Sequence, residues 1–255
     1  MLSTGLILGS ASPRRASLLR QIGAAFETRS ADADESLENL SDPREYVMEL
    51  AARKARAVSD IIRGDADIRK KYNRVIIIGA DTVVVTINGD ILGKPKDSAD
   101  AERMLRLLSG NWHEVFTGVS LMDMRLPAAG AAPTDLRISS AVTHTGGDGG
   151  VFGGCGGADR GFYTHAASAD YEKTRVKVCE LDEEAIGRYV GSGEPEGKAG
   201  AYAIQGVGSL FIDRVEGCYY NIVGLPLRLL RTMLGALGYD LLKTNCLGHN
   251  NGDFF

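Results

Sequence analysis

Short apolar runs alternate with amphipathic segments along this chain, an order that favours an α/β architecture with helices packed on a sheet. Leu6–Leu8 and Val75–Ile78 are apolar at every position, which is typical of buried strands, and Val75–Ile78 is predicted to be central. Val83–Ile87 and Ile91–Leu92 flank Asn88-Gly89, a dipeptide that predicts a tight hairpin.

Capping residues mark the expected helices. Ser12 and Pro13 begin a helix that should end at Ile22, and Asp42-Pro43 begin a second that should reach Arg63. The same reasoning predicts three later helices: Ser98–Leu108, a short helix after Asp182, and Pro226–Leu237.

Alternation predicts further strands in the second half of the chain. They are expected at Glu114–Met122 and Thr174–Leu181. Leu210–Ile212 and Tyr219–Val223 are expected to form a hairpin around Glu216-Gly217, and Gly191–Gly208 is expected to be a polar loop.

The pattern stops between about Met124 and Ser168, where Gly, Ala, Pro and Ser dominate. A segment without apolar periodicity cannot offset its ordering entropy, so we expect a mobile insertion between two strands. A glycine-rich phosphate cradle is the alternative, but it needs a preceding strand, a following helix and a Gly-Lys-Ser/Thr ending, which are missing here. The expected domain is therefore 1–243, with the insertion at about 124–168 and a tail at 244–255.

Composition narrows the class of protein. A chain of 255 residues forms one large domain or two small ones, and its net charge of −4 argues against nucleic-acid binding. The apolar runs are far shorter than the ~18 residues of a membrane span. The N-terminus lacks a basic region, and the four cysteines show no CxxC or zinc-ligand spacing. We therefore expect a cytoplasmic protein with reduced thiols and no membrane partner.

Two arginines occupy the first turn of the predicted helix at Pro13. Arg14 and Arg15 follow Ser10 and Ser12, at a point where free N–H groups already create positive potential. Cations are unfavourable there unless an anion docks beside them. The alternative is two solvated arginines on a helix surface.

Lys54 and Asp81 are polar residues in apolar settings. Lys54 falls within the apolar stripe of Val47, Leu50 and Val58, so it is either a side chain that reaches out from the core edge or one that faces a polar cleft. Asp81 interrupts a β-type run, and ligand groups gather at the carboxyl ends of strands in open α/β sheets. It is a candidate base or metal ligand, or else a turn aspartate.

Lys94, the Asp32–Glu35 loop and Gln205 point to a binding site only when they are considered together. Lys94 and the acidic Asp32–Glu35 loop would each be solvated surface charges if taken alone. Gln205, in the small-residue segment Gly197–Gly206, carries donor and acceptor groups suited to a base edge, although a tight packed loop is the alternative. Together these cations, carboxylates and amide suggest a site for a phosphate ester with an attached heterocycle.

These motifs resemble those of the Maf family of nucleoside triphosphate pyrophosphatases. The resemblance covers nearly all of the chain except the insertion and the tail. The matching stretches are Leu6–Arg15, Ile78–Thr82, Leu92–Lys96, Met104–Gly110 with the following His113–Val119, Gly193–Gly206 and Tyr219–Leu227. The resemblance implies a twisted mixed β-sheet flanked by helices around a deep cleft, similar to inosine triphosphate pyrophosphatases.

The resemblance also implies roles for individual residues. Asp81 would accept the proton of the attacking water, and Glu35 would help it to hold Mg²⁺ or Mn²⁺. The triphosphate would contact Ser10, Arg14, Arg15, Lys54 and Lys94. Base choice would involve Arg14, Thr82 and Gln205.

The implied reaction is hydrolysis of a nucleoside triphosphate to the monophosphate and pyrophosphate, and no covalent intermediate is required. The form of Tyr202–Gly206 resembles the dTTP/UTP branch, although Ala203 stands where glycine is usual. The alternatives are a modified purine such as 7-methyl-GTP as substrate, or a non-catalytic nucleotide-binding regulator of cell division. The nucleoside triphosphate is the expected partner, and the insertion leaves cleft access and assembly open, with a homodimer as a candidate.

Overall fold

A mixed β-sheet organises the computed structural model, which describes residues 3–33, 40–126 and 164–245. The strand order is β2-β1-β3-β5-β6-β7, and β4 pairs with β3. The strands are β1 (Ser3–Leu8), β2 (Glu27–Thr28), β3 (Tyr72–Thr86), β4 (Ile91–Leu92), β5 (Trp112–Arg125), β6 (Thr164–Val178) and β7 (Ile212–Glu216). β1 runs parallel to β2 and β3, and the other pairs are antiparallel.

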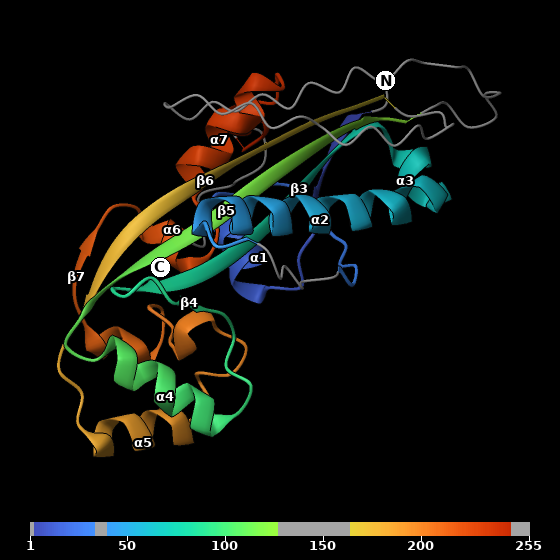
Figure 1. Cartoon of the computed structure of the whole chain (residues 1–255). Helices are drawn as coiled ribbons and strands as arrows, with labels where there is room; N and C mark the ends of the chain where they lie inside the picture. Colours follow the sequence, from blue (N-terminus) through green and yellow to red (C-terminus); the bar gives the residue numbers. More distant parts are fainter. Residues whose placement is uncertain (1–2, 34–39, 127–163, 246–255) are drawn as a thin grey trace, which may run out of the picture.

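Helices cover both faces of this sheet (Figure 1). They are α1 (Pro13–Gln21), α2 (Pro43–Gly64), α3 (Ala66–Lys71), α4 (Ser98–Leu108), α5 (Glu183–Gly191), α6 (Tyr219–Val223), α7 (Leu227–Ala236) and α8 (Leu241–Asn245), with 3₁₀ turns η1 (Ala199–Ala201) and η2 (Val207–Phe211). The predicted α/β class with a mixed sheet flanked by helices is confirmed.

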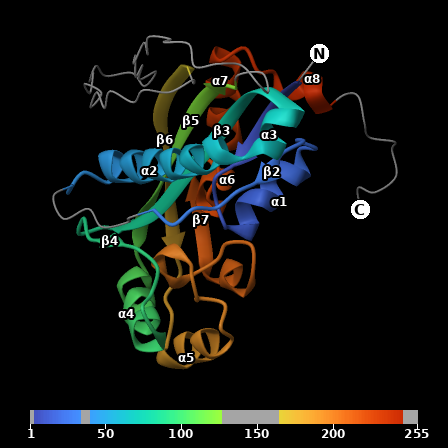
Figure 2. The same cartoon turned by 90° about the vertical axis from the view of Figure 1, so that its right-hand side faces the viewer.

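Side chains of β3 alternate between two apolar layers. Ile76 and Ile78 pack with residues of α1 and α7, whereas Ile77 packs against α2. This alternation is the period-2 pattern of a strand buried on both faces. Figure 2 shows α4 and α5 together beyond one end of the long strands, where they enclose a further apolar cluster with the loop before β7.

Two glycines let α2 lie unusually close to the sheet. A Cβ on Gly79 would meet the Ala51 carbonyl oxygen at 2.1 Å, and one on Gly118 would meet the Val47 carbonyl oxygen at 2.3 Å. Gly118 is the register partner of Asp81, and Gly79 lies two residues before it, so all three share the face that α2 covers. The close approach therefore fixes the height of α2 above Asp81.

Most predicted helix boundaries are confirmed. Ser12 accepts a bond from the Arg15 amide, Asp42 caps α2, and α4 has the expected limits. The hairpin at Gly89 is also confirmed, since β4 pairs antiparallel with β3.

The expected hairpin of Leu210–Ile212 with Tyr219–Val223 is wrong. Ile212–Glu216 is a strand, but it pairs with β6, and Tyr219–Val223 is a helix. The tertiary environment outweighs the β-propensity of this segment, because the side-chain Nδ2 of Asn221 donates to the Val115 carbonyl and the Thr174 hydroxyl.

The predicted start of β6 at Thr174 is also wrong, since the strand begins at Thr164 and pairs with β5 up to Arg125. Both ends of the predicted insertion thus belong to the sheet, and 127–163 lie outside the described residues. Cys179 and Cys218 are free and half-buried. No helix in the described ranges combines the length and apolar character needed to cross a bilayer.

Candidate active site

A gap in strand pairing opens one edge of β3. β1 pairs with β3 up to Leu8 and Ile78, and β4 begins to pair at Val84. The Gly9 amide donates to the Ile78 carbonyl at 2.8 Å, so alternation turns the backbone groups of Ala80 toward the open edge. A cleft of about 740 Å³ lies along this edge, where side chains from both faces of the sheet can reach it.

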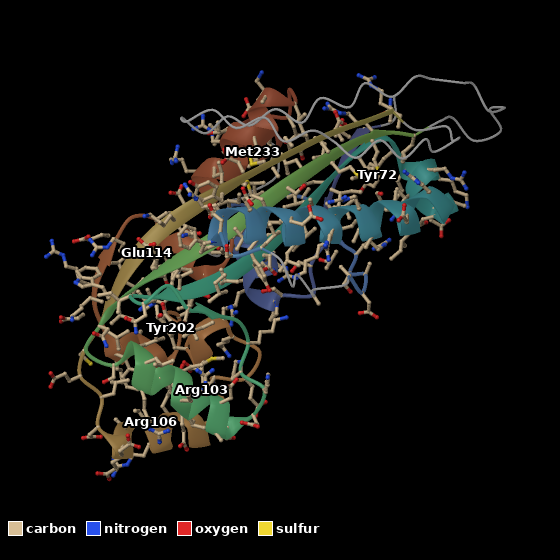
Figure 3. All side chains as sticks on the ribbon, viewed as in Figure 1. Tyr72, Arg103, Arg106, Glu114, Tyr202 and Met233 are labelled. Atoms are coloured by element: carbon tan, nitrogen blue, oxygen red, sulfur yellow. The ribbon has the colours of Figure 1, made fainter. Side chains whose placement is uncertain are left out.

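The cleft brings together candidate residues that lie far apart in the sequence. All the predicted site residues in the described part of the chain line it: Ser10, Arg14, Arg15, Lys54, Asp81, Thr82, Lys94 and Gln205. Glu35 lies outside the described residues. Tyr202 also lines the cleft, and Figure 3 shows it where the strands meet the α4 region, far from Tyr72 at their other end.

Lys54 and Asp81 form a largely buried ion pair in the cleft. Lys54 Nζ donates to Asp81 Oδ1 at 2.5 Å, and the two side chains are 14% and 12% exposed. Asp81 lies inside β3 rather than after the strand as the sequence suggested, and the open edge gives it access to the cleft. A lysine on the core face of α2 is accommodated because it meets this carboxylate.

The Arg15 side chain is buried in the cleft wall and makes hydrogen bonds to three other residues. Its Nε donates to the Gly224 carbonyl at 2.7 Å, Nη1 to Ser10 Oγ at 3.1 Å and Nη2 to Thr82 Oγ1 at 3.0 Å. Gly224 has φ 116°, a conformation that favours glycine, and a Cβ at this position would lie 3.6 Å from Arg15 Nε. The guanidinium group of Arg15 thus links α1, β3 and the end of α6 through hydrogen bonds.

A chain of hydrogen bonds between hydroxyl groups continues from Arg15 through the sheet, and the direction of each bond can be assigned. Thr117 Oγ1 donates to the Asn221 carbonyl at 3.0 Å and lies 2.9 Å from Thr82 Oγ1. Because each hydroxyl has one proton, Thr82 must donate to Thr117 and accept from Arg15. The orientation of the Thr82 hydroxyl is therefore fixed by groups behind the cleft.

The cleft carries more positive than negative side chains, although the whole chain has a net charge of −4. In its described lining, Arg14, Arg15, Lys54, Lys94 and Lys198 face three carboxylates, those of Asp32, Asp81 and Glu196. Such a concentration of cations suits a polyanionic ligand.

The charge of Arg14 acts on Lys198, and both side chains line this cleft. Burial lowers the pKa of Arg14, and burial followed by the charge of Arg14 lowers the pKa of Lys198. Both shifts mark cations that a bound anion would stabilise.

The segment after α5 is hydrogen-bonded to the connection between β4 and α4. The Gly200 amide donates to the Gly93 carbonyl at 3.0 Å, next to Lys94. Gly200 has φ 68° and Ala201 φ 58°, and a Cβ on Gly200 would lie 2.8 Å from Val84 Cγ2. This left-handed pair brings the Gln205 side of the cleft close to β3.

Oxygen donors for a metal are present but sparse in the described wall. Asp32 and Asp81 line the cleft, and carboxylates are the ligands that Mg²⁺ and Mn²⁺ prefer. Within the described ranges, no three His, Cys, Asp or Glu side chains gather closely enough to hold an ion. The donor chemistry fits a divalent metal that also uses phosphate oxygens of a substrate.

Sequence reasoning overlooked the residues behind the cleft. Thr117, Asn221 and Glu194 make their contacts across the fold, and no local pattern distinguishes them from ordinary strand, helix or loop residues. Lys198 lies inside the small-residue segment Gly197–Gly206, and its position between Gly197 and Gly200 was the signal available.

Comparison with known proteins identifies the family. The model of the family described as Maf-like protein matches residues 5–237. A dTTP/UTP pyrophosphatase of Caldicellulosiruptor bescii is 39% identical over 238 residues, which cover 93% of this chain and 97% of that protein. One from Pelotomaculum thermopropionicum is 41% identical over 237 residues, covering 93% and 98%. The chain belongs to the Maf family, and this prediction from its motifs is confirmed.

Proposed function

We propose that this chain hydrolyses dTTP and UTP to the nucleoside monophosphate and pyrophosphate, through attack of water on the α-phosphate. The observation that carries the proposal is the cleft itself, which joins the Lys54–Asp81 pair to the cations Arg14, Arg15 and Lys94. The names of the similar proteins, dTTP/UTP pyrophosphatases, support the same reaction and substrates.

Asp81 would act as the proton acceptor. Lys54 engages Oδ1, and no hydrogen bond to Oδ2 is present among the described residues. Oδ2 would therefore take the proton of the attacking water, while Lys54 holds the carboxylate in one orientation. A general base positioned in this way typically increases the reaction rate by a factor of ~10²–10⁴.

The cations would hold the triphosphate and stabilise the charge that builds on its oxygens. Ser10 Oγ accepts bonds from Arg15 and from the Ser12 amide, so its own proton can be donated to a phosphate oxygen. Arg14 and Lys94 would balance the charge of the pyrophosphate leaving group. Gln205 and Thr82, with Arg14, would contact the base.

A divalent metal fits this arrangement. Asp81 and Glu35 would hold Mg²⁺ or Mn²⁺, which would supply charge neutralisation and polarisation of the phosphoryl group. We expect the enzyme to act in the cytoplasm without nucleic-acid or membrane partners, and a homodimer is the candidate assembly that sedimentation velocity would test.

A nucleotide panel with product identification tests the proposal. dTTP and UTP with Mg²⁺ or Mn²⁺ should release pyrophosphate faster than 7-methyl-GTP does, and Asp81→Asn should lower the rate at least ~10²-fold. Asp213→Asn, at an exposed position of β7, is the matched control. Release of orthophosphate alone would contradict the reaction, and binding without turnover under every metal would indicate a regulator.

A further inference from the structure

The Glu194 carboxylate gathers three donors beside the cleft. Oε1 accepts from the Tyr189 hydroxyl at 2.9 Å and the Gly208 amide at 3.0 Å, and Oε2 accepts from the Val207 amide at 2.9 Å. Burial acts to raise the pKa of Glu194, but the bonds from Gly208, Val207 and Tyr189 outweigh it, and the pKa is lowered. Glu194 is therefore an anion at neutral pH, and all three bonds are charge-assisted.

Tyr189 extends this contact to the other side of the same segment. Its hydroxyl donates to Glu194 and accepts from the Ala203 amide at 3.1 Å. Burial raises the pKa of Tyr189, so the hydroxyl keeps its proton. Tyr189 is 2% exposed, and its ring packs edge-on against Phe211 with centroids 5.0 Å apart, which leaves the hydroxyl little freedom.

Two glycines permit this close approach. A Cβ on Gly206 would lie 2.2 Å from Glu194 Oε2, and one on Gly208 would lie 2.6 Å from the Tyr189 hydroxyl. No other residue type fits at these positions without displacing the bonds. The backbone from Ala203 to Gly208 is thus held against Tyr189 and Glu194 at both of its ends.

Gln205 sits in the middle of this held backbone. Ala203 is fixed before it and Val207 after it, while Gln205 itself is exposed and lines the cleft. We propose that Tyr189 and Glu194 are positioning residues that hold Gln205 in place and so set which nucleobase the cleft accepts. This inference rests on the proposed function, because it takes the ligand to be a nucleoside triphosphate.

The positioning role differs from a merely structural one in what it changes. A hydrogen bond with a merely structural role supports the binding of every ligand equally, so its loss would lower the affinity for all nucleotides by the same factor. A bond that positions Gln205 acts only where Gln205 discriminates, so its loss would change the ratio between bases.

The variant that tests this role is Tyr189→Phe, which keeps the ring and removes the hydroxyl. It deprives the Ala203 amide of its acceptor and Glu194 of one donor. Tyr219→Phe is the control, because Tyr219 is 43% exposed and its hydroxyl makes no hydrogen bond within the described part of the chain.

Binding of the α,β-methylene analogues of dTTP and dATP, measured by calorimetry with Mg²⁺, tests the inference independently of hydrolysis. Tyr189→Phe should reduce the preference for the dTTP analogue about tenfold, the usual effect of one misplaced hydrogen bond, and Tyr219→Phe should not. In a Gln205→Ala background, Tyr189→Phe should cause no further change in preference. Glu194→Gln should reproduce the loss of preference if Tyr189→Phe proves unstable.

An unchanged preference, or effects of Tyr189→Phe and Gln205→Ala that multiply, would overturn the inference. Wild-type protein that binds both analogues equally would overturn it as well. If the analogues bind as expected while dTTP is not hydrolysed, the proposed function fails and the positioning role stands.

Discussion

Lys54 Nζ lies 2.5 Å from Asp81 Oδ1 and so joins the middle of α2 to the interior of β3. Both side chains are largely shielded from water, where an ion pair persists only with good geometry. The pair exists because Gly79 and Gly118 let the α2 backbone approach the sheet. A packing feature of two strands thus sets the geometry of the proposed catalytic carboxylate.

Replacing Lys54 with methionine tests this pair. Lys54→Met keeps the side-chain length but leaves the Asp81 carboxylate without its counter-charge, which should cost about 1–3 kcal/mol of unfolding free energy. The rate of pyrophosphate release should fall about 10²-fold, because the carboxylate loses its fixed orientation and a phosphate-binding cation is removed. Arg53→Met, one residue earlier on α2, should change the rate little, and equal rates for the two variants would refute the assigned role of Lys54.

A methyl group at Gly79 should separate the pair without altering either partner. The added Cβ would meet the Ala51 carbonyl at 2.1 Å, so Gly79→Ala must displace α2. We expect a loss of about 3 kcal/mol in urea unfolding together with reduced turnover. Gly64→Ala, at the end of the same helix, meets nothing within 4 Å and should be neutral or slightly stabilising. Matching stability curves for the two variants would show that the close approach is unimportant.

Removing the Thr117 hydroxyl should release the Thr82 hydroxyl from its fixed orientation. Thr117→Val is nearly isosteric, but it takes away the acceptor of Thr82 and the donor to the Asn221 carbonyl. The variant should lose about 1–3 kcal/mol of stability and raise KM more than it lowers kcat. Thr117→Ser restores the hydroxyl and should recover KM. Equal KM values for the valine and serine variants would exclude a role in orienting Thr82.

His113 should make stability depend on pH. The residue is 1% exposed, its Nε2 lies 2.8 Å from the Tyr202 hydroxyl, and burial lowers its pKa to about 4. The unfolded chain binds a proton near its ordinary pKa of 6.5 while the folded chain does not, so stability falls as pH drops from about 6.5 to 4, by up to about 3 kcal/mol.

Urea unfolding of His113→Gln across this pH range measures the effect. Glutamine can still bond to Tyr202 but does not titrate, so its stability curve should be flatter between pH 4 and 6.5. A curve parallel to that of the wild type would assign the pH dependence to other groups.

Local signals predicted much of the fold because they act within a few residues. Ser12 and Asp42 satisfy helix amides directly, and Gly89 supplies the left-handed position in the turn that joins β3 to β4. These interactions need no distant partner. The helices capped by these residues and the first hairpin were therefore predictable from the sequence.

Features that depend on distant partners were not predictable. Tyr219–Val223 has strand-like composition, yet Asn221 draws it into a helix by bonding to β5 and β6. Asp81 looked like a residue after a strand, because no sequence pattern shows that β1 stops pairing at Leu8 and leaves the edge of β3 open. The cations of the site could be identified as candidates, but their convergence required the fold.

Hydrolysis of dTTP in H₂¹⁸O, followed by mass spectrometry of both products, tests the central claim most directly. Water that attacks the α-phosphate beside Asp81 should place one ¹⁸O in dTMP and none in pyrophosphate in a single turnover. Label in pyrophosphate, or in orthophosphate with dTDP as the other product, would contradict the account.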